Sequence, residues 1–191
     1  MKKTLLLLAN GFEPFEAAAF IDVFGWNLIE GDKSTKLFSC GLTKEVSSSF
    51  GQKMLADYTL DEIYASDFDA IAIPGGFEEY GFYEDAYDEK FLNLIRDFRN
   101  QNKPIASICV AALALGKSGI LKGIKATTYK NPVRIEALKD FGGDVQDEMF
   151  VIHDNIITSC GPSTATDVAF TLLRILTTEQ NEKNVRQLMG F

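Results

Sequence analysis

Short, almost wholly apolar runs alternate along this chain with longer segments in which apolar residues recur every three or four positions. A short apolar run bounded by turn-forming residues is typical of a strand buried on both faces of a parallel sheet. Four runs up to residue 108 have this character: residues 5–9, 37–41, 69–73 and 104–108. Helical spacing follows the first run, from about 15 to 30, and the third, from 89 to 100.

The second half continues the alternation with shorter strands, which we expect around residues 126–128, 145, 150–152 and 156–158. Helices are expected at 133–140, 165–176 and 179–189. The polar residues 42–56 favour a hairpin or an extended connection. Strands that alternate with helices predict an α/β fold, a three-layer sandwich with a mainly parallel, flavodoxin-like central sheet. No repeat or linker interrupts the chain, so we expect residues 1–191 to form one domain.

Composition and charge narrow the classes of function. Hydrophobic residues make up 46% and charged residues 24% of the 191, as is ordinary for a soluble globular protein. The net charge of -8 repels phosphate backbones and anionic lipid, so we expect no nucleic-acid or membrane partner. The opening residues 2–8 imitate a signal peptide but lack a cleavage-site pattern, and no apolar stretch approaches the roughly 20 residues that span a bilayer. A cytoplasmic location is therefore predicted.

The three cysteines are far apart and form no Cys-x-x-Cys pair, which argues against a disulfide framework and a zinc ribbon. Free thiols fit a reducing compartment better. The single histidine, His153, excludes His-rich metal motifs and leaves any Cys-His scheme dependent on one residue. We expect neither a metal nor a cofactor.

Residues 104–113 contain the most informative pattern, an apolar strand that runs directly into an apolar helix with Cys109 at the junction. Such a junction resembles a nucleophile elbow. A thiol placed there feels the unpaired N–H groups and the positive end of the helix dipole, which favour thiolate and predict a lowered pKa. The alternative is that Cys109 is a small buried hydrophobe, a common fate of free cysteine. The position alone leaves both open.

Two other strand ends carry candidate groups, because ligands of such sheets bind outside the carboxyl ends of the strands. The backbone amides of Gly75 and Gly76, with that of Val110, could stabilise an oxyanion, although a Gly-Gly pair also suits a plain tight turn. Glu16 follows the first strand and could hydrogen-bond the thiol. Alternatively, Glu16 only complements the dipole of the helix that it begins.

Five motifs occur in order along the chain: Asn10-Gly11-Phe12-Glu13 with Glu16, Pro74-Gly75-Gly76, Ser107-Ile108-Cys109, Lys125-Ala126-Thr127-Thr128, and residues 157–164. Together they resemble the ThiJ/PfpI superfamily over nearly the whole chain. The resemblance implies a class I glutamine amidotransferase-like sandwich, usually a homodimer. It also implies a reactive cysteine at Cys109, a glutamate partner at Glu16, and oxyanion donors at Gly76 and Val110.

The chain departs from this family where many members carry a histidine. Tyr129 follows the Thr-Thr pair in place of histidine, and Val110 follows the cysteine. Both departures argue against a Cys-His dyad. Tyr129 could still donate a hydrogen bond, although a pKa near 10 makes tyrosine a poor base. His153 precedes an Asp-Asn turn, where we favour a surface role over a catalytic one.

The remaining features favour structural interpretations. Residues 78–89 are rich in acidic and aromatic side chains, and we favour a solvated loop or short helix there. If this segment bordered the pocket, it would disfavour anionic substrates. Cys160 lies at another strand end and could approach the site, but we favour buried packing for it and for Cys40.

The leading hypothesis is a cysteine-dependent enzyme that acts on a small carbonyl compound or related electrophile, with Cys109 as nucleophile and Glu16 as proton carrier. Glyoxalase, deglycase, amidase and isonitrile-hydrating chemistries all fit this outline. The main alternative is a non-enzymatic redox sensor or stress-response chaperone that uses oxidation of Cys109. A cysteine peptidase is a weaker alternative because a suitable histidine is missing.

Overall fold

The apolar runs pair side by side in a seven-stranded sheet of the order β10-β11-β7-β6-β1-β2-β5. The computed structural model describes all residues from 1 to 191. The strands are β1 (Lys2–Leu7), β2 (Thr35–Gly41), β5 (Tyr58–Thr59), β6 (Ala70–Ile73), β7 (Ile105–Ile108), β10 (Phe150–His153) and β11 (Ile156–Ser159). Only β10 runs antiparallel to its neighbour. The predicted α/β sandwich with a mainly parallel central sheet is therefore confirmed.

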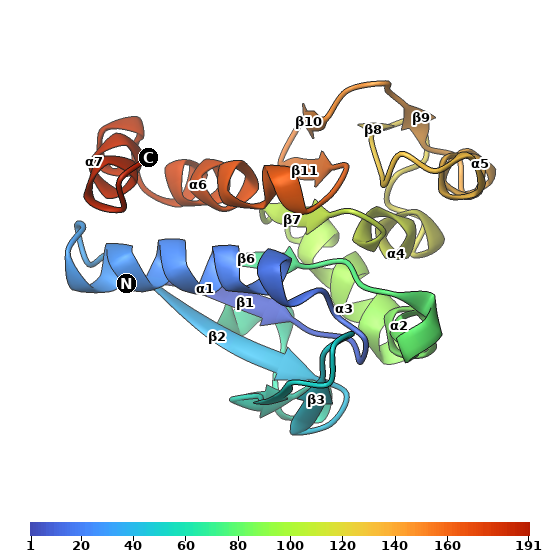
Figure 1. Cartoon of the computed structure of the whole chain (residues 1–191), viewed down its shortest axis with the longest axis horizontal. Helices are drawn as coiled ribbons and strands as arrows, with labels where there is room; N and C mark the ends of the chain where they lie inside the picture. Colours follow the sequence, from blue (N-terminus) through green and yellow to red (C-terminus); the bar gives the residue numbers. More distant parts are fainter.

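Helices cover both faces of the sheet (Figure 1). One face packs against α1 (Pro14–Ile29) and α6 (Ala165–Leu176), with α7 (Glu179–Leu188) beside them. The opposite face packs against α3 (Glu89–Asn100) and α4 (Ala111–Lys117), with α2 (Phe82–Ala86) beside α3 and α5 (Pro132–Asp140) beside α4. Both faces of β1 and β6 are therefore buried, which explains why these strands are apolar where they cross the core, apart from the buried Thr4.

Two small sheets lie outside the central one. β3 (Glu45–Ser47) and β4 (Lys53–Leu55) form the antiparallel hairpin expected within residues 42–56. β8 (Lys125–Ala126) and β9 (Asp144–Val145) form a separate parallel pair. The strand expected at 126–128 thus ends early, because the Thr127 N–H donates to the Thr158 hydroxyl (2.9 Å) and the Thr128 hydroxyl donates to the Cys109 carbonyl (3.0 Å).

The loop before α2 contains the short 3-10 helix η3 (Glu78–Tyr80), and together they fold over the carboxyl ends of β6 and β7. The backbone of Phe77 anchors this loop, since its N–H donates to the Gly11 carbonyl at 2.9 Å. None of the helices combines the length and apolar character needed to cross a bilayer.

Candidate active site

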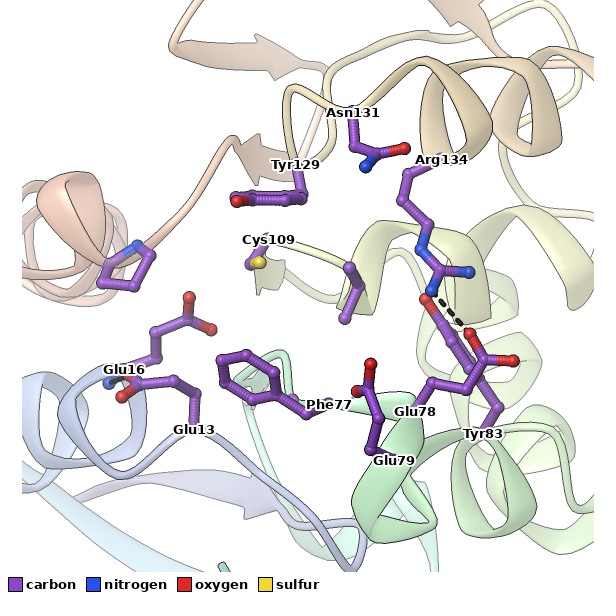
Figure 2. Close-up of a pocket in the computed structure, with 13 residues that line it drawn as sticks. Glu13, Glu16, Phe77, Glu78, Glu79, Tyr83, Cys109, Tyr129, Asn131 and Arg134 are labelled. Carbon is purple, nitrogen blue, oxygen red and sulfur yellow. Dashed lines mark hydrogen bonds and ion pairs between the residues drawn. The ribbon is translucent and has the colours of Figure 1, made fainter. Parts of the chain in front are cut away.

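The carboxyl ends of β1, β6, β7 and β11 meet at one edge of the sheet, where they surround a cavity of about 400 Å³ (Figure 2). Glu13 and Glu16 follow β1, and Gly76 and Phe77 follow β6. Cys109 and Val110 follow β7, and Pro162 follows β11. The structure thus brings together the strand ends that the sequence predicts to carry the chemistry.

Cys109 occupies a strained turn between β7 and α4. Its φ of 58° lies in the left-handed region, which a non-glycine residue adopts at a cost of roughly 1–3 kcal/mol. Hydrogen bonds hold the turn on both sides: the Cys109 N–H donates to the Ser159 carbonyl (2.8 Å), and the Thr128 hydroxyl donates to the Cys109 carbonyl. A sharp strand-to-helix turn of this kind directs the side chain out of the sheet into the cavity.

Glu16 lies in the first turn of α1 and is fully buried. Glu13 caps the helix by accepting a hydrogen bond from the Glu16 N–H (2.8 Å), and Pro14 fits the first helical turn. This cap fixes the direction of the Glu16 side chain. Its Oε2 accepts a hydrogen bond of 2.6 Å from the Gly75 N–H, whereas its Oε1 is buried and has no hydrogen-bond partner. The Glu16 carboxyl faces the Cys109 sulfur in Figure 2.

Burial raises the pKa of Glu16 from 4.5 to about 8. The Gly75 N–H opposes this shift because it stabilises the charged carboxylate, and the nearby Glu13 adds to it through like-charge repulsion. A large fraction of Glu16 is therefore protonated at neutral pH. A protonated carboxyl can donate a hydrogen bond to sulfur, which the charged form cannot do.

Burial also raises the pKa of the Cys109 thiol, and a charged Glu16 raises it further, while the Val110 N–H lowers it. The lowered pKa expected from the sequence is therefore wrong for this geometry. The helix end acts in the expected direction, but the loss of solvation around the sulfur is larger. Protonation of Glu16 removes the repulsive charge, so the ionisation of the thiol depends on the proton at Glu16.

The two glycines after β6 have different roles. A Cβ atom at Gly75 would lie 2.8 Å from the Cys109 Cβ and 3.0 Å from the Glu16 Oε2, so only glycine fits between them. The Gly75 N–H already donates to Glu16. It is therefore not free to serve as an oxyanion donor, contrary to the expectation from the sequence. The Gly76 N–H has no partner within the chain. Gly76 and Val110 remain the candidate donors.

The outer wall of the cavity includes the start of α5 and the residues before it, where the sequence offered only Tyr129 as a possible auxiliary site residue. Tyr129, Asn131 and Arg134 reach it from the start of α5, and Arg134 forms an ion pair of 2.6 Å with Glu78. The guanidinium carbon of Arg134 also lies 5.1 Å from the centre of the Tyr83 ring. No local signal marks Arg134 as a site residue, because only the folding of α5 over the sheet edge brings it there.

The acidic segment 78–89 is only partly the solvated loop that we expected. Glu78 and Glu79 line the cavity, as the less favoured alternative proposed. Asp85 has a structural role, since it accepts hydrogen bonds from the backbone and side chain of Asn10. The pocket wall therefore carries carboxylates at Glu78 and Glu79, and Arg134 is paired with Glu78 alone.

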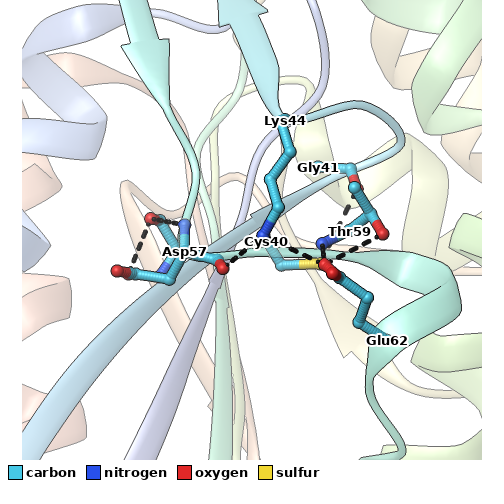
Figure 3. A network of polar contacts seen from close by, with 7 residues as sticks. Cys40, Gly41, Lys44, Asp57, Thr59 and Glu62 are labelled. Carbon is cyan, nitrogen blue, oxygen red and sulfur yellow. Dashed lines mark hydrogen bonds and ion pairs between the residues drawn. The ribbon is translucent and has the colours of Figure 1, made fainter.

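Three residues considered from the sequence lie outside the cavity lining. His153 is at the end of β10, where its Nδ1 accepts a hydrogen bond from the Lys125 N–H (3.0 Å). Cys160 is buried next to Met149, with 3.3 Å between the two sulfur atoms. Cys40 is buried on β2 beside the polar network of Lys44 and Glu62 (Figure 3). The favoured interpretation of buried packing for both cysteines is confirmed.

The fold and this site define an α/β protein with a cysteine at a strand-to-helix elbow, opposite a buried glutamate. The model of the DJ-1/PfpI family matches residues 2–175. The chain therefore belongs to the DJ-1/PfpI family, as its motifs indicated.

Three relatives illustrate the range of the similarity. Protein DJ-1 homolog B of Arabidopsis thaliana is 33% identical over 170 residues, which are 88% of this chain and 36% of that protein. Protein/nucleic acid deglycase 2 of Escherichia coli is 29% identical over 165 residues, which are 84% of this chain and 90% of that protein. Drosophila melanogaster DJ-1beta superposes with a TM-score of 0.85 at 28% identity, over 98% of this chain and 97% of that one. The chain spans 36–58% of the length of the first curated relatives that it matches.

Proposed function

We propose that this chain is a cysteine-dependent enzyme for a small, uncharged carbonyl compound, with Cys109 as nucleophile and Glu16 as proton carrier. One observation supports this above the others: the thiol at the strained elbow faces a fully buried carboxyl whose pKa is raised to about 8. A group with a pKa near the working pH is best suited to give and take a proton.

The chemistry follows from the positions of these groups. The Cys109 thiol gives its proton to the charged form of Glu16 as the sulfur forms a bond to the carbonyl carbon, and the electron pair of the C=O double bond moves to the oxygen. The N–H groups of Gly76 and Val110 donate hydrogen bonds to that oxygen, and a proton from Glu16 neutralises it. The carboxylate that results can then accept a proton in a later step. Glyoxalase, deglycase and amidase reactions share this first addition.

The charges in the pocket favour uncharged over anionic substrates. Glu13, Glu78 and Glu79 line the cavity, and the only cation there, Arg134, is already paired with Glu78. A carboxylate on the substrate would be repelled by these groups, and no free cation compensates for the loss of its hydration.

A substrate panel tests this proposal. We would assay wild type and Cys109→Ala in parallel on methylglyoxal, a glycated model peptide, a simple amide, and pyruvate as the anionic counterpart of methylglyoxal. Turnover of at least one uncharged compound is expected, with no activity in Cys109→Ala and little with pyruvate. Equal activity in wild type and Cys109→Ala would show that the thiol is not the nucleophile.

A redox role is the second candidate, and the exposure of the thiols favours it. Cys109 is partly exposed, whereas Cys40 and Cys160 are buried. Peroxide would therefore reach Cys109 first, and the Glu16 carboxyl and Val110 N–H could hold the oxidised sulfur. Oxygen addition at Cys109, with no turnover of any carbonyl substrate, would favour this function.

A peptidase is less well supported, because no histidine lines the cavity.

We further propose that the chain forms a homodimer through the outer face of α1 and the end of α7. Ile21, Trp26, Ile29 and Leu188 expose apolar surface there, around a shallow hollow of about 530 Å³. A contiguous apolar patch outside the active site is typical of a protein interface. A second copy of the chain is the partner that this family resemblance implies.

A further inference from the structure

The ends of β7 and β11 bring Cys109 and Cys160 next to each other. These strands are parallel neighbours in which Ile108 pairs with Ser159, so the two cysteines occupy the following position in the same register. The Cys109 N–H donates to the Ser159 carbonyl at 2.8 Å, which shows that the strands are still in contact at this point. Register partners of adjacent parallel strands have neighbouring Cα atoms, so the two cysteines start from adjacent backbone positions.

The spacing suits a disulfide. Neighbouring strands are about 4.8 Å apart, within the range of about 4.4–6.8 Å between Cα atoms that a disulfide bridges. The third cysteine has no comparable position, because β6 and β1 lie between β7 and the strand that carries Cys40. Cys109 therefore has one thiol within reach.

In the reduced structure the Cys160 thiol points elsewhere. Its sulfur contacts the Met149 sulfur on the side of β10, where the Cys160 N–H also donates to the Met149 carbonyl (3.0 Å). A thiol-thioether contact is weak, and χ1 of cysteine has alternative staggered positions. Rotation about χ1 would break this contact and leave the backbone hydrogen bonds in place, so that the sulfur of Cys160 could turn toward Cys109.

The geometry points to Cys160 as the resolving thiol that closes an intramolecular disulfide with Cys109 after Cys109 is oxidised by a peroxide. In the first step the Cys109 thiolate attacks one peroxide oxygen and the O–O bond breaks, which gives a sulfenic acid and, after protonation, an alcohol or water. In the second step the Cys160 sulfur attacks the sulfenic sulfur, and the thiol proton leaves with the displaced hydroxide as water. The two thiols lose two electrons in total, and the peroxide gains them.

A disulfide at this position would protect Cys109 from further oxidation. A sulfenic acid that meets no thiol is open to a second peroxide and to the irreversible sulfinic acid. Closure of the disulfide consumes the sulfenic acid, and a dithiol reductant can then restore the free Cys109 thiol. This inference requires only that Cys109 reacts with peroxide, so it does not depend on the proposed carbonyl chemistry.

The test compares wild type, Cys160→Ser and the matched control Cys40→Ser after a short treatment with hydrogen peroxide and alkylation of the remaining thiols. Wild type and Cys40→Ser should lose two hydrogen atoms in mass and yield a peptide that links Cys109 to Cys160. Dithiothreitol should reverse this change. Cys160→Ser should instead gain two oxygen atoms on Cys109, which dithiothreitol does not remove.

Peptide mapping of the wild type tests the inference even if a variant folds poorly. A wild type that gains oxygen at Cys109 without a link to Cys160 would overturn it. A link between two copies of the chain, seen as a band of doubled mass on a non-reducing gel, would overturn it too. Equal rates of sulfinic acid formation in wild type and Cys160→Ser would do the same.

Discussion

Cys109 and Glu16 determine each other's protonation, so the chemistry of the site belongs to the pair. Burial alone disfavours charge on either group, and one negative charge in the pair makes a second one costly. The Gly75 N–H is directed at the carboxyl and the Val110 N–H at the sulfur, so the backbone has one donor for each place where the charge can reside. A proton can move between the groups without a second charge in the cavity.

This raised pKa predicts a specific dependence of stability on pH. Between 4.5 and about 8 the folded protein keeps a proton on Glu16 that the unfolded chain has released. The contribution to stability is fully present below pH 4.5 and is lost as the pH rises through about 8. The free energy of unfolding should therefore fall with pH by up to about 1.4 kcal/mol per unit from this one group. Glu16→Gln should show a flatter profile in urea denaturation over the same range.

The same variant separates a catalytic from a structural role of Glu16. Glutamine keeps a hydrogen-bond donor of similar shape but cannot transfer a proton, so turnover should fall by about 100-fold or more. Glu16→Leu should lose both the donor and the proton. A flat stability profile with wild-type turnover in Glu16→Gln would show that Glu16 only supports the fold, and that the proton travels through Tyr129 or water.

At the scale of elements, the sequence predicts most of the architecture because burial on both faces leaves an unambiguous pattern. The apolar run before Pro74 and the helical repeat of 89–100 lie where they were expected, at Ala70–Ile73 and Glu89–Asn100. The short elements are harder to predict: β5 has two residues, and α2 lies in an acidic segment without a helical repeat. Tertiary contacts, and not local preference, determine such elements.

Some residues of the candidate site could likewise be predicted from the sequence, and others could not. Cys109, Glu16 and Gly76 follow strands, and their convergence could be predicted from the parallel order of the sheet. The ion pair of Arg134 with Glu78 could not be predicted, because 56 residues separate the two and the pair exists only once α5 and the loop before α2 fold over the same edge. The protonation of Cys109 was also beyond the sequence, since it depends on how deeply the sulfur is buried.

Gly75 lies in close contact with Cys109 and Glu16, and its substitution tests whether the site requires this close packing. A methyl group there would meet the Cys109 Cβ at 2.8 Å and the Ile108 carbonyl oxygen at 2.9 Å, closer than real Cβ contacts. Gly75→Ala should therefore destabilise the protein by roughly 1–3 kcal/mol and abolish most turnover as the elbow shifts. Gly25→Ala is the matched control, because a Cβ there meets nothing within 4 Å. In the middle of α1 it should stabilise by roughly 0.5–1 kcal/mol in urea denaturation. Similar effects of both substitutions would show that the close packing at Gly75 is not what the site requires.

At the scale of the whole molecule, the active site and the proposed dimer face share one helix. The first turn of α1 holds Glu13 and Glu16 in the cavity, and its later turns expose Trp26 and Ile29. An interface on the later turns would restrain the helix that positions the carboxyl. The dimer is therefore expected to make the geometry of the Cys109–Glu16 pair more uniform, in addition to covering apolar surface.

Substitution of Ile29 tests the dimer. Light scattering at micromolar concentration should give twice the chain mass of 21.2 kDa for wild type. Ile29→Glu places a carboxylate in the proposed apolar contact, where it would lose its hydration without gaining a cation, so the dissociation constant should rise by about 100-fold or more. Leu55→Glu is the matched control: Leu55 is even more exposed than Ile29, at 79% against 66%, but lies on β4, outside that face. It should remain a dimer. A monomeric wild type would remove the dimer altogether, and dissociation by Leu55→Glu but not by Ile29→Glu would move the interface from α1 to the β3–β4 hairpin.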